Sequence, residues 1–239
     1  MQTALATLVL LAANVCTQAQ GEQATKANGR PAEIKQATAS LGEGNSATES
    51  AVRYTYEFAQ PEFYVRHIVV EHDGAGRGKV SFERKADRET LTDPLELSPT
   101  ALGRITALWN ALRFLESNTN YQSSKQFPHL GTMRLAMRGG GRERIAEFNW
   151  TKDPDASALV NEYRRIVDQA LFVFDIALAR QNQPLETPKI LKRLDTLLAR
   201  GALSDPQQLI PLLGDIQTDE RLPLIARNHA GRLLKKLNK

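Results

Sequence analysis

Residues 69–84, VVEHDGAGRGKVSFER, could form either a phosphate-binding loop or the turn of a β-hairpin. Three glycines and a lysine separate two apolar runs, and glycine-rich loops with a lysine can bind phosphate. A P-loop needs glycine where this chain has Asp73, and a hydroxyl residue where it has Val80. A phosphate loop also leads into a helix, whereas KVSFERK alternates apolar and polar residues as a strand does. We therefore predict a β-hairpin, with glycines supplying positive φ in its turn.

Further strands are predicted on both sides of this hairpin, because aromatic or branched residues alternate with polar ones. The segment YTYEFA precedes it, and TMRLAM and RERIAEFNW follow, joined by three glycines at 139–141. Strands joined by tight turns pair antiparallel. The sequence thus predicts one antiparallel sheet of about five strands.

Two helices interrupt and follow these strands. Ser98 can cap a helix that has Pro99 in its first turn, and Asp153 precedes a long helix over residues 156–180. The order is β-β-β-α-β-β-α, which predicts an α+β domain at 52–181 with helices on one face of the sheet.

The last third, residues 182–239, is predicted to be entirely helical. Helical spacing of leucines marks residues 188–200, a short helix after Ser204-Asp205-Pro206, and residues 222–237. The stretch LFVFDIALA in the long helix is apolar on more than one face, so we expect the C-terminal helices to dock on it.

Residues 205–238, DPQQLIPLLGDIQTDERLPLIARNHAGRLLKKLN, resemble a single helical hairpin of the HEAT-repeat type. The matching features are the LIPLL helix, the acidic turn Asp219-Glu220, and a second helix with Arg227, Ala230 and Leu233. HEAT arrays stack several repeats, and only one is found here. The resemblance implies a helical pair and a protein-contact surface, and it covers only this part of the chain.

The N-terminus has the pattern of an export signal. Residues 4–15 are small or apolar, which suits a signal peptide and is too short to span a bilayer. We predict a signal peptide at 1–19 cleaved near Ala19, and a secreted or periplasmic protein. The alternatives are a lipoprotein that begins at Cys16, or an apolar N-terminus that stays on the chain. Residues 20–51 are small and polar, which predicts a disordered linker.

Metal and thiol chemistry are not expected. Cys16 is the only cysteine, so cleavage after Ala19 leaves none. His67, Glu71 and His72 lie in a predicted strand, where His67 and Glu71 are roughly 13 Å apart and His72 points to the opposite face. We expect no cofactor and no metal.

The acidic and aromatic candidates also have structural explanations. Asp153 and Asp155 could act as paired carboxylates, although acids at a helix start also suit its dipole. Asp175 continues a polar stripe on the long helix, so we expect it to be solvated or salt-bridged. Trp109 and Trp150 are predicted to pack in the core.

The excess of basic residues lies at the C-terminus. The formal net charge is +4, and residues 186–239 alone carry ten Lys and Arg against six Asp and Glu. The exposed candidates for binding an acidic partner are Arg227, Arg232, Lys235 and Lys236, although a solvated helix face would look the same.

The leading functional hypothesis is an exported, non-catalytic protein that binds a protein or cell-envelope component through its sheet or C-terminal helices. The alternative is a hydrolase of an unrecognised class that uses carboxylates such as Asp153 and Asp155. A third hypothesis is that the basic C-terminus binds an acidic partner or nucleic acid. Export would argue against nucleic-acid binding, which needs a cytoplasmic protein. No transmembrane span is expected, and the oligomeric state is left open.

Overall fold

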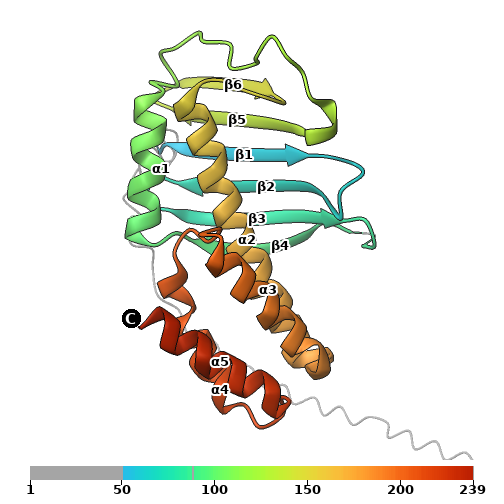
Figure 1. The fold of residues 1–239 in the computed structure, drawn as a ribbon. Coiled ribbons are helices and arrows are strands. Elements are labelled where there is room, and N and C mark those ends of the chain that lie inside the picture. The colour runs from blue at the N-terminus through green and yellow to red at the C-terminus, as the bar shows by residue number, and fades with distance from the viewer. Residues whose placement is uncertain (1–50, 88, 239) are drawn as a thin grey trace, which may run out of the picture. The chain divides into compact units, whose positions relative to one another are not determined.

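The computed structural model describes residues 51–87 and 89–238. The predicted signal peptide, its cleavage near Ala19, the alternative lipidation of Cys16 and the linker up to residue 50 lie outside these residues and stay predictions. The described residues form an α+β fold with one antiparallel sheet and a helical C-terminal part (Figure 1).

The sheet has six strands in the order β4-β3-β2-β1-β5-β6, and every neighbouring pair is antiparallel. The strands are β1 (Arg53–Ala59), β2 (Val65–Asp73), β3 (Arg77–Arg84), β4 (Leu91–Glu96), β5 (Thr132–Gly139) and β6 (Arg142–Phe148). The predicted antiparallel sheet is confirmed, with one strand more than expected.

The sixth strand is β4, LTDPLE, which the sequence analysis missed because it contains Pro94 and lacks a clear alternation. It pairs with β3 at the edge of the sheet, where Pro94 lies opposite Lys79. A proline cannot donate to a neighbouring strand, so proline within a sheet is found at an edge.

The glycine-rich loop is the turn of the β2–β3 hairpin, as predicted. Gly76 has φ +79°, a conformation that side chains rarely adopt, and a Cβ at Gly78 would collide with the backbone carbonyl of Glu71. The loop leads from one strand into the next and not into a helix. Its glycines thus serve the turn.

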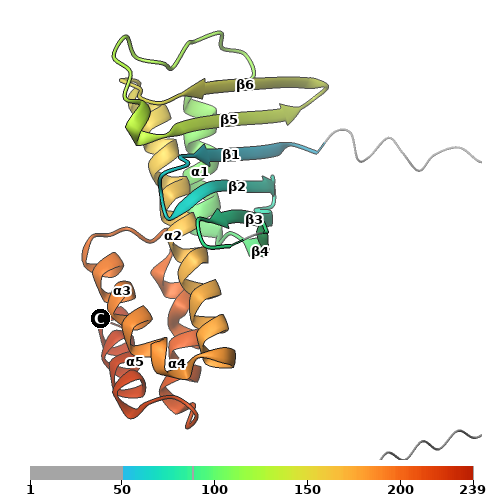
Figure 2. The ribbon, with the colours of Figure 1, turned by 90° about the vertical axis from the view of Figure 1, so that its right-hand side faces the viewer.

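Two helices cover one face of the sheet (Figures 1 and 2). Helix α1 (Pro99–Ala111) begins after Ser98, whose side chain accepts a hydrogen bond from the Ala101 amide as expected of an N-cap. Helix α2 (Pro154–Asn182) is longer than predicted at both ends. The other face of the sheet carries cross-strand ion pairs, such as Lys79–Glu71 at 2.9 Å.

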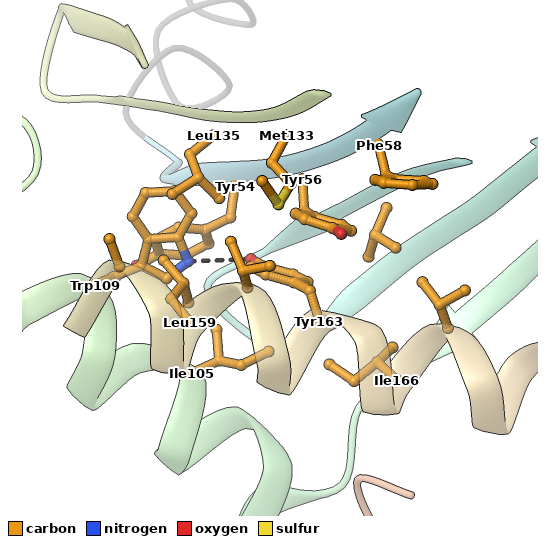
Figure 3. Close-up of a cluster of buried hydrophobic side chains, with 14 of the residues drawn as sticks. Tyr54, Tyr56, Phe58, Ile105, Trp109, Met133, Leu135, Leu159, Tyr163 and Ile166 are labelled. Atoms are coloured by element: carbon orange, nitrogen blue, oxygen red, sulfur yellow. Dashed lines mark hydrogen bonds between the residues drawn. The ribbon is translucent and has the colours of Figure 1, made fainter. Parts of the chain in front are cut away.

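The main core lies between the sheet and these helices (Figure 3). Aromatic rings dominate its centre: Tyr56 and Tyr163 stack with 5.0 Å between ring centroids, and Trp109 is 1% exposed. The strands contribute every second residue, as their alternation predicted.

The C-terminal part is a second apolar cluster built on the far half of α2. Its helices are α3 (Thr187–Ala199), α4 (Ile210–Thr218) and α5 (Leu224–Leu237), with short 3₁₀ turns at Pro184–Glu186 (η2) and Pro206–Leu209 (η3). A further 3₁₀ turn, η1 (Pro128–Leu130), precedes β5 in the sheet domain. Phe172 and Ile176 of α2 are fully buried in this cluster, so the docking of these helices on α2 is confirmed.

Because α2 belongs to both clusters, the boundary between residues 181 and 182 as a domain division stays a prediction. Helices α4 and α5 lie against each other, and the Asp219 carboxylate in the connection between them pairs with Arg180 of α2 at 3.0 Å. Of the helices in the described ranges, none combines the length and apolar character needed to cross a membrane.

Candidate functional site

An apolar cleft lies between α2 and the part of the sheet formed by β1, β2, β5 and β6. Its volume is about 760 Å³, within the range of about 300–1,000 Å³ typical of small-molecule sites. Its walls are mostly apolar side chains, among them Tyr56, Phe58, Met133, Phe148, Val160 and Leu171. In Figure 1 the strands extend beyond α1 and α2 toward the β1–β2 connection.

Three large aromatic side chains line this cleft and are nevertheless exposed to solvent. Phe63 is 44% exposed, Tyr64 63% and Trp150 44%. Phe63 and Tyr64 belong to the β1–β2 connection, and Trp150 follows β6. Exposed aromatic residues gathered at a concave surface are typical of a binding site and not of a monomer surface at large.

The segments that carry these rings are held by hydrogen bonds. Gln60 donates from its side-chain amide to the Pro128 carbonyl at 3.0 Å, which ties the β1–β2 connection to η1. Asn149 exchanges hydrogen bonds with Gln122 at 2.9 and 3.1 Å. The Trp150 ring packs edge-on against Phe127, with 5.4 Å between centroids. The walls of the cleft are therefore largely preformed.

Two charged residues of α2 line the cleft, Arg164 and Asp168. Burial raises the pKa of the Asp168 carboxyl, against the opposing effect of the guanidinium groups of Arg193 and Arg164. Burial also raises the pKa of Tyr56 to about 12, although the Arg164 guanidinium beside its hydroxyl acts to lower it. Both residues therefore combine an apolar surrounding with a nearby cation.

The histidines of β2 lie as the strand geometry predicted, on opposite faces of the sheet. His67 pairs with Glu57 at 3.0 Å on the open face, and His72 is buried against Tyr163. Burial lowers the pKa of His72. Within residues 51–87 and 89–238, no three His, Cys, Asp or Glu side chains come together as metal ligands would.

The two acids proposed for catalysis lie at the start of α2. Asp153 is the N-cap, and its Oδ1 accepts a hydrogen bond from the Ala156 amide at 2.9 Å. Asp155 is in the first turn, where a carboxylate suits the helix dipole. Asp175 is salt-bridged as expected, to Arg84 and, at 2.6 Å, to Arg193. A catalytic role for Asp153 and Asp155 stays a prediction.

The four basic candidates lie along α5, away from the cleft. Arg232, Lys235 and Lys236 are exposed and Arg227 is half-buried. Lys236 pairs with Asp195 of α3 at 2.5 Å, so part of this charge is neutralised within the helical part. Their role in binding a partner stays a prediction.

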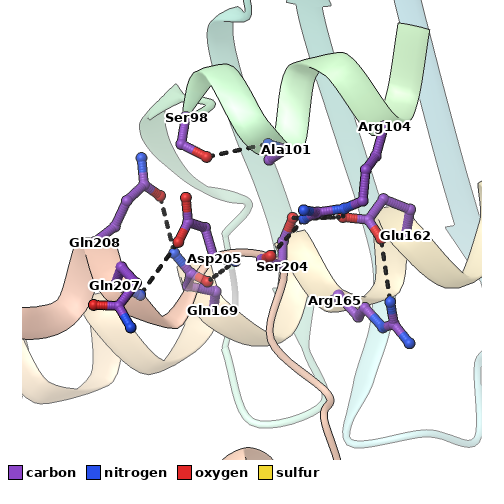
Figure 4. Close-up of polar contacts among 10 residues, drawn as sticks. All are labelled: Ser98, Ala101, Arg104, Glu162, Arg165, Gln169, Ser204, Asp205, Gln207 and Gln208. Atoms are coloured by element: carbon purple, nitrogen blue, oxygen red, sulfur yellow. Dashed lines mark hydrogen bonds and ion pairs between the residues drawn. The ribbon is translucent and has the colours of Figure 1, made fainter. Parts of the chain in front are cut away.

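A polar cluster joins the C-terminal part to the sheet domain (Figure 4). The carboxylate of Glu162 is 4% exposed and accepts hydrogen bonds from Arg104 at 2.8 Å and from the Ser204 hydroxyl at 2.7 Å. The Asp205 amide donates to Gln169 at 2.9 Å. These contacts connect α1, α2 and the segment before η3, so we assign the cluster a structural role.

The sequence analysis missed the cleft, and one of its predictions there is wrong. Trp109 is in the core as expected, but Trp150 is 44% exposed at the cleft. Trp150 is the second residue after the last strand, where the alternation of β6 no longer applies. The consecutive aromatic residues Phe63 and Tyr64, just after Pro61, were the available signal.

Searched against models of known protein families, the sequence matches none.

Proposed function

We propose that this is a non-catalytic binding protein whose site is the cleft between the sheet and α2, and that it binds an apolar small molecule. The observation that carries this proposal is the exposure of Phe63, Tyr64 and Trp150 around a cleft of about 760 Å³. Leaving such surface in water costs free energy, and a ligand that covers it recovers that free energy at roughly 25 cal/mol per Å².

The lining suits reversible binding. Apolar walls contribute affinity but do not fix the orientation of a ligand. The few polar groups at the cleft, such as Asn161 and Arg164, can orient it. This proposal keeps a non-catalytic binding function. It replaces the expected partner, a protein or cell-envelope component bound through the sheet or C-terminal helices, with a small molecule bound in the cleft. Export of the chain remains a separate proposal that rests on residues 1–19.

The test is titration with N-phenyl-1-naphthylamine, a neutral probe whose fluorescence rises in apolar sites. We expect saturable binding to the full chain. The variant Asn161→Phe adds a ring on an exposed residue that lines the cleft, and it should weaken binding at least about tenfold, or about 1.4 kcal/mol. The matched control is Ala177→Phe, on an exposed position of α2 outside the lining.

Equal loss of binding in both variants, or none in either, would mean that the probe does not occupy the cleft. Absence of saturable binding to the unmodified protein would remove the proposal altogether. Circular dichroism of each variant shows whether it is folded.

A further inference from the structure

The charge arrangement at the cleft carries an inference about the chemical class of the ligand. Of the described residues that line it, Arg164 is the only Lys or Arg and Asp168 the only Asp or Glu. A ligand that enters this cleft meets an apolar wall with one guanidinium group on it.

Arg164 differs from the other arginines of α2 in having no carboxylate partner among residues 51–87 and 89–238. Arg165 pairs with Glu162, and Arg180 with Asp219. The Nη2 of Arg164 donates instead to the Met133 sulfur at 3.4 Å. A thioether is a weak acceptor and a guanidinium has five N–H donors, so Arg164 retains N–H groups to which an anion could bind.

The neighbouring acid, Asp168, lines the same cleft but forms no ion pair with Arg164 among the described residues. Asp168 lies in the field of both Arg164 and Arg193. Arg193 and Arg84 share the Asp175 carboxylate between them. Of these three guanidinium groups only Arg164 lines the cleft, so an anion that enters it would be bound by Arg164.

The geometry of the donors favours a carboxylate. A guanidinium binds a carboxylate through two parallel N–H bonds. The Tyr56 hydroxyl lies beside Arg164 and stays protonated, because burial raises its pKa to about 12. It can therefore donate to the same anion.

Resting on the proposed function, we propose that the ligand is a single-chain amphiphilic carboxylic acid. Its carboxylate binds Arg164 and its apolar chain lies along the wall formed by Phe58, Met133 and Val160. No bond is made or broken, so the protein would hold or carry this molecule and not convert it.

The experiment compares three probes with the same chain: dodecanoate, dodecanol and dodecyltrimethylammonium, each below its micelle-forming concentration at pH 8. Binding is measured by calorimetry on the full chain. We expect dodecanoate to bind about tenfold or more tightly than dodecanol, as a charge-assisted hydrogen-bonded pair predicts, and the ammonium ion to bind most weakly.

Arg164→Gln should lower the affinity for dodecanoate more than the affinity for dodecanol, so that the preference disappears, and Arg164→Lys should restore only part of the preference. The matched control, Arg165→Gln on the adjacent residue, should keep the full preference. Dodecanol binding also reports that each variant is folded.

Each other outcome overturns the inference in a distinguishable way. Equal affinity for dodecanoate and dodecanol, or a preference that survives Arg164→Gln, rejects the carboxylate and leaves the apolar site standing. A preference for the ammonium ion would instead assign the aromatic rings to cation binding. If none of the three binds, the proposed function fails as well.

Discussion

At the scale of single residues, Tyr163 connects the two layers of the core. An indole N–H only donates, so the Tyr163 hydroxyl accepts from Trp109 Nε1 at 3.0 Å and donates to His72 Nε2 at 2.9 Å. The other ring nitrogen of His72 donates to the Asp73 carbonyl at 2.8 Å. Burial lowers the pKa of His72 and so favours the neutral ring, whose Nε2 accepts from Tyr163 when Nδ1 carries the proton. Figure 3 shows the Trp109–Tyr163 bond.

We predict that Tyr163→Phe destabilises the protein by about 1–3 kcal/mol, because two buried polar groups lose their shared partner. Urea unfolding measures this loss. Tyr56→Phe is the matched control, since it removes a buried hydroxyl from the ring stacked on Tyr163 and leaves the Trp109 and His72 bonds intact. A loss no larger than that of the control would contradict this account of Tyr163.

The neutrality of His72 predicts a dependence of stability on pH. Burial lowers its pKa below the ordinary value of 6.5. Between that value and the lowered one, the unfolded chain binds a proton that the folded chain does not, so stability falls as pH decreases below about 6.5. Above about pH 6.5 the ring is neutral in both the folded and the unfolded chain, so this loss of stability is absent there.

Unfolding free energies from pH 8 to pH 5 test this, with His72→Gln as the comparison because other groups also titrate. The decline toward acid pH should be shallower in His72→Gln than in the unmodified protein. Parallel curves would show that His72 is not the group responsible.

At the scale of elements, the helices and strands that carry a local signal in their own residues were predicted from the sequence. Ser98 and Asp153 cap helices as expected, and the strands with aromatic alternation were found. Strand β4 was missed because Pro94 argues against a strand, and only the free edge beside β3 makes it acceptable. That edge is a property of the sheet and not of the segment.

The attachment of the C-terminal helices also belongs to this scale. The buried carboxylate of Glu162 is satisfied mainly by Arg104 and Ser204 (Figure 4). We predict that Arg104→Ala costs about 3 kcal/mol, because it removes the closer of the two cations from a buried carboxylate. Hydrogen exchange should also become faster in the segment from Ser204 onward.

Arg165→Ala is the control, because Arg165 is exposed and its contact with Glu162 is longer, 3.4 Å. It should cost less than about 1 kcal/mol. Similar costs for the two variants would show that the cluster does not hold the C-terminal part in place.

At the scale of the whole molecule, the cleft is the feature that sequence reasoning could not assemble. Its lining comes from separate stretches of the chain, around residues 56–68, 130–151 and 157–171. Each stretch alone looks like core, and Trp150 was predicted accordingly. The cleft forms where α2 and these strands come together, so its lining depends on the packed arrangement and not on any one stretch.

The most direct test of the cleft as a binding site is a ¹H–¹⁵N NMR titration with dodecanol, whose lack of charge keeps it independent of the role of Arg164. The chain has two tryptophans, so the two indole signals report on separate places. We predict large shifts for the Trp150 indole and the amides near Phe58 and Val160, and a nearly constant signal for Trp109. Shifts confined to α5 or the open sheet face, or none at saturating dodecanol, would contradict the account.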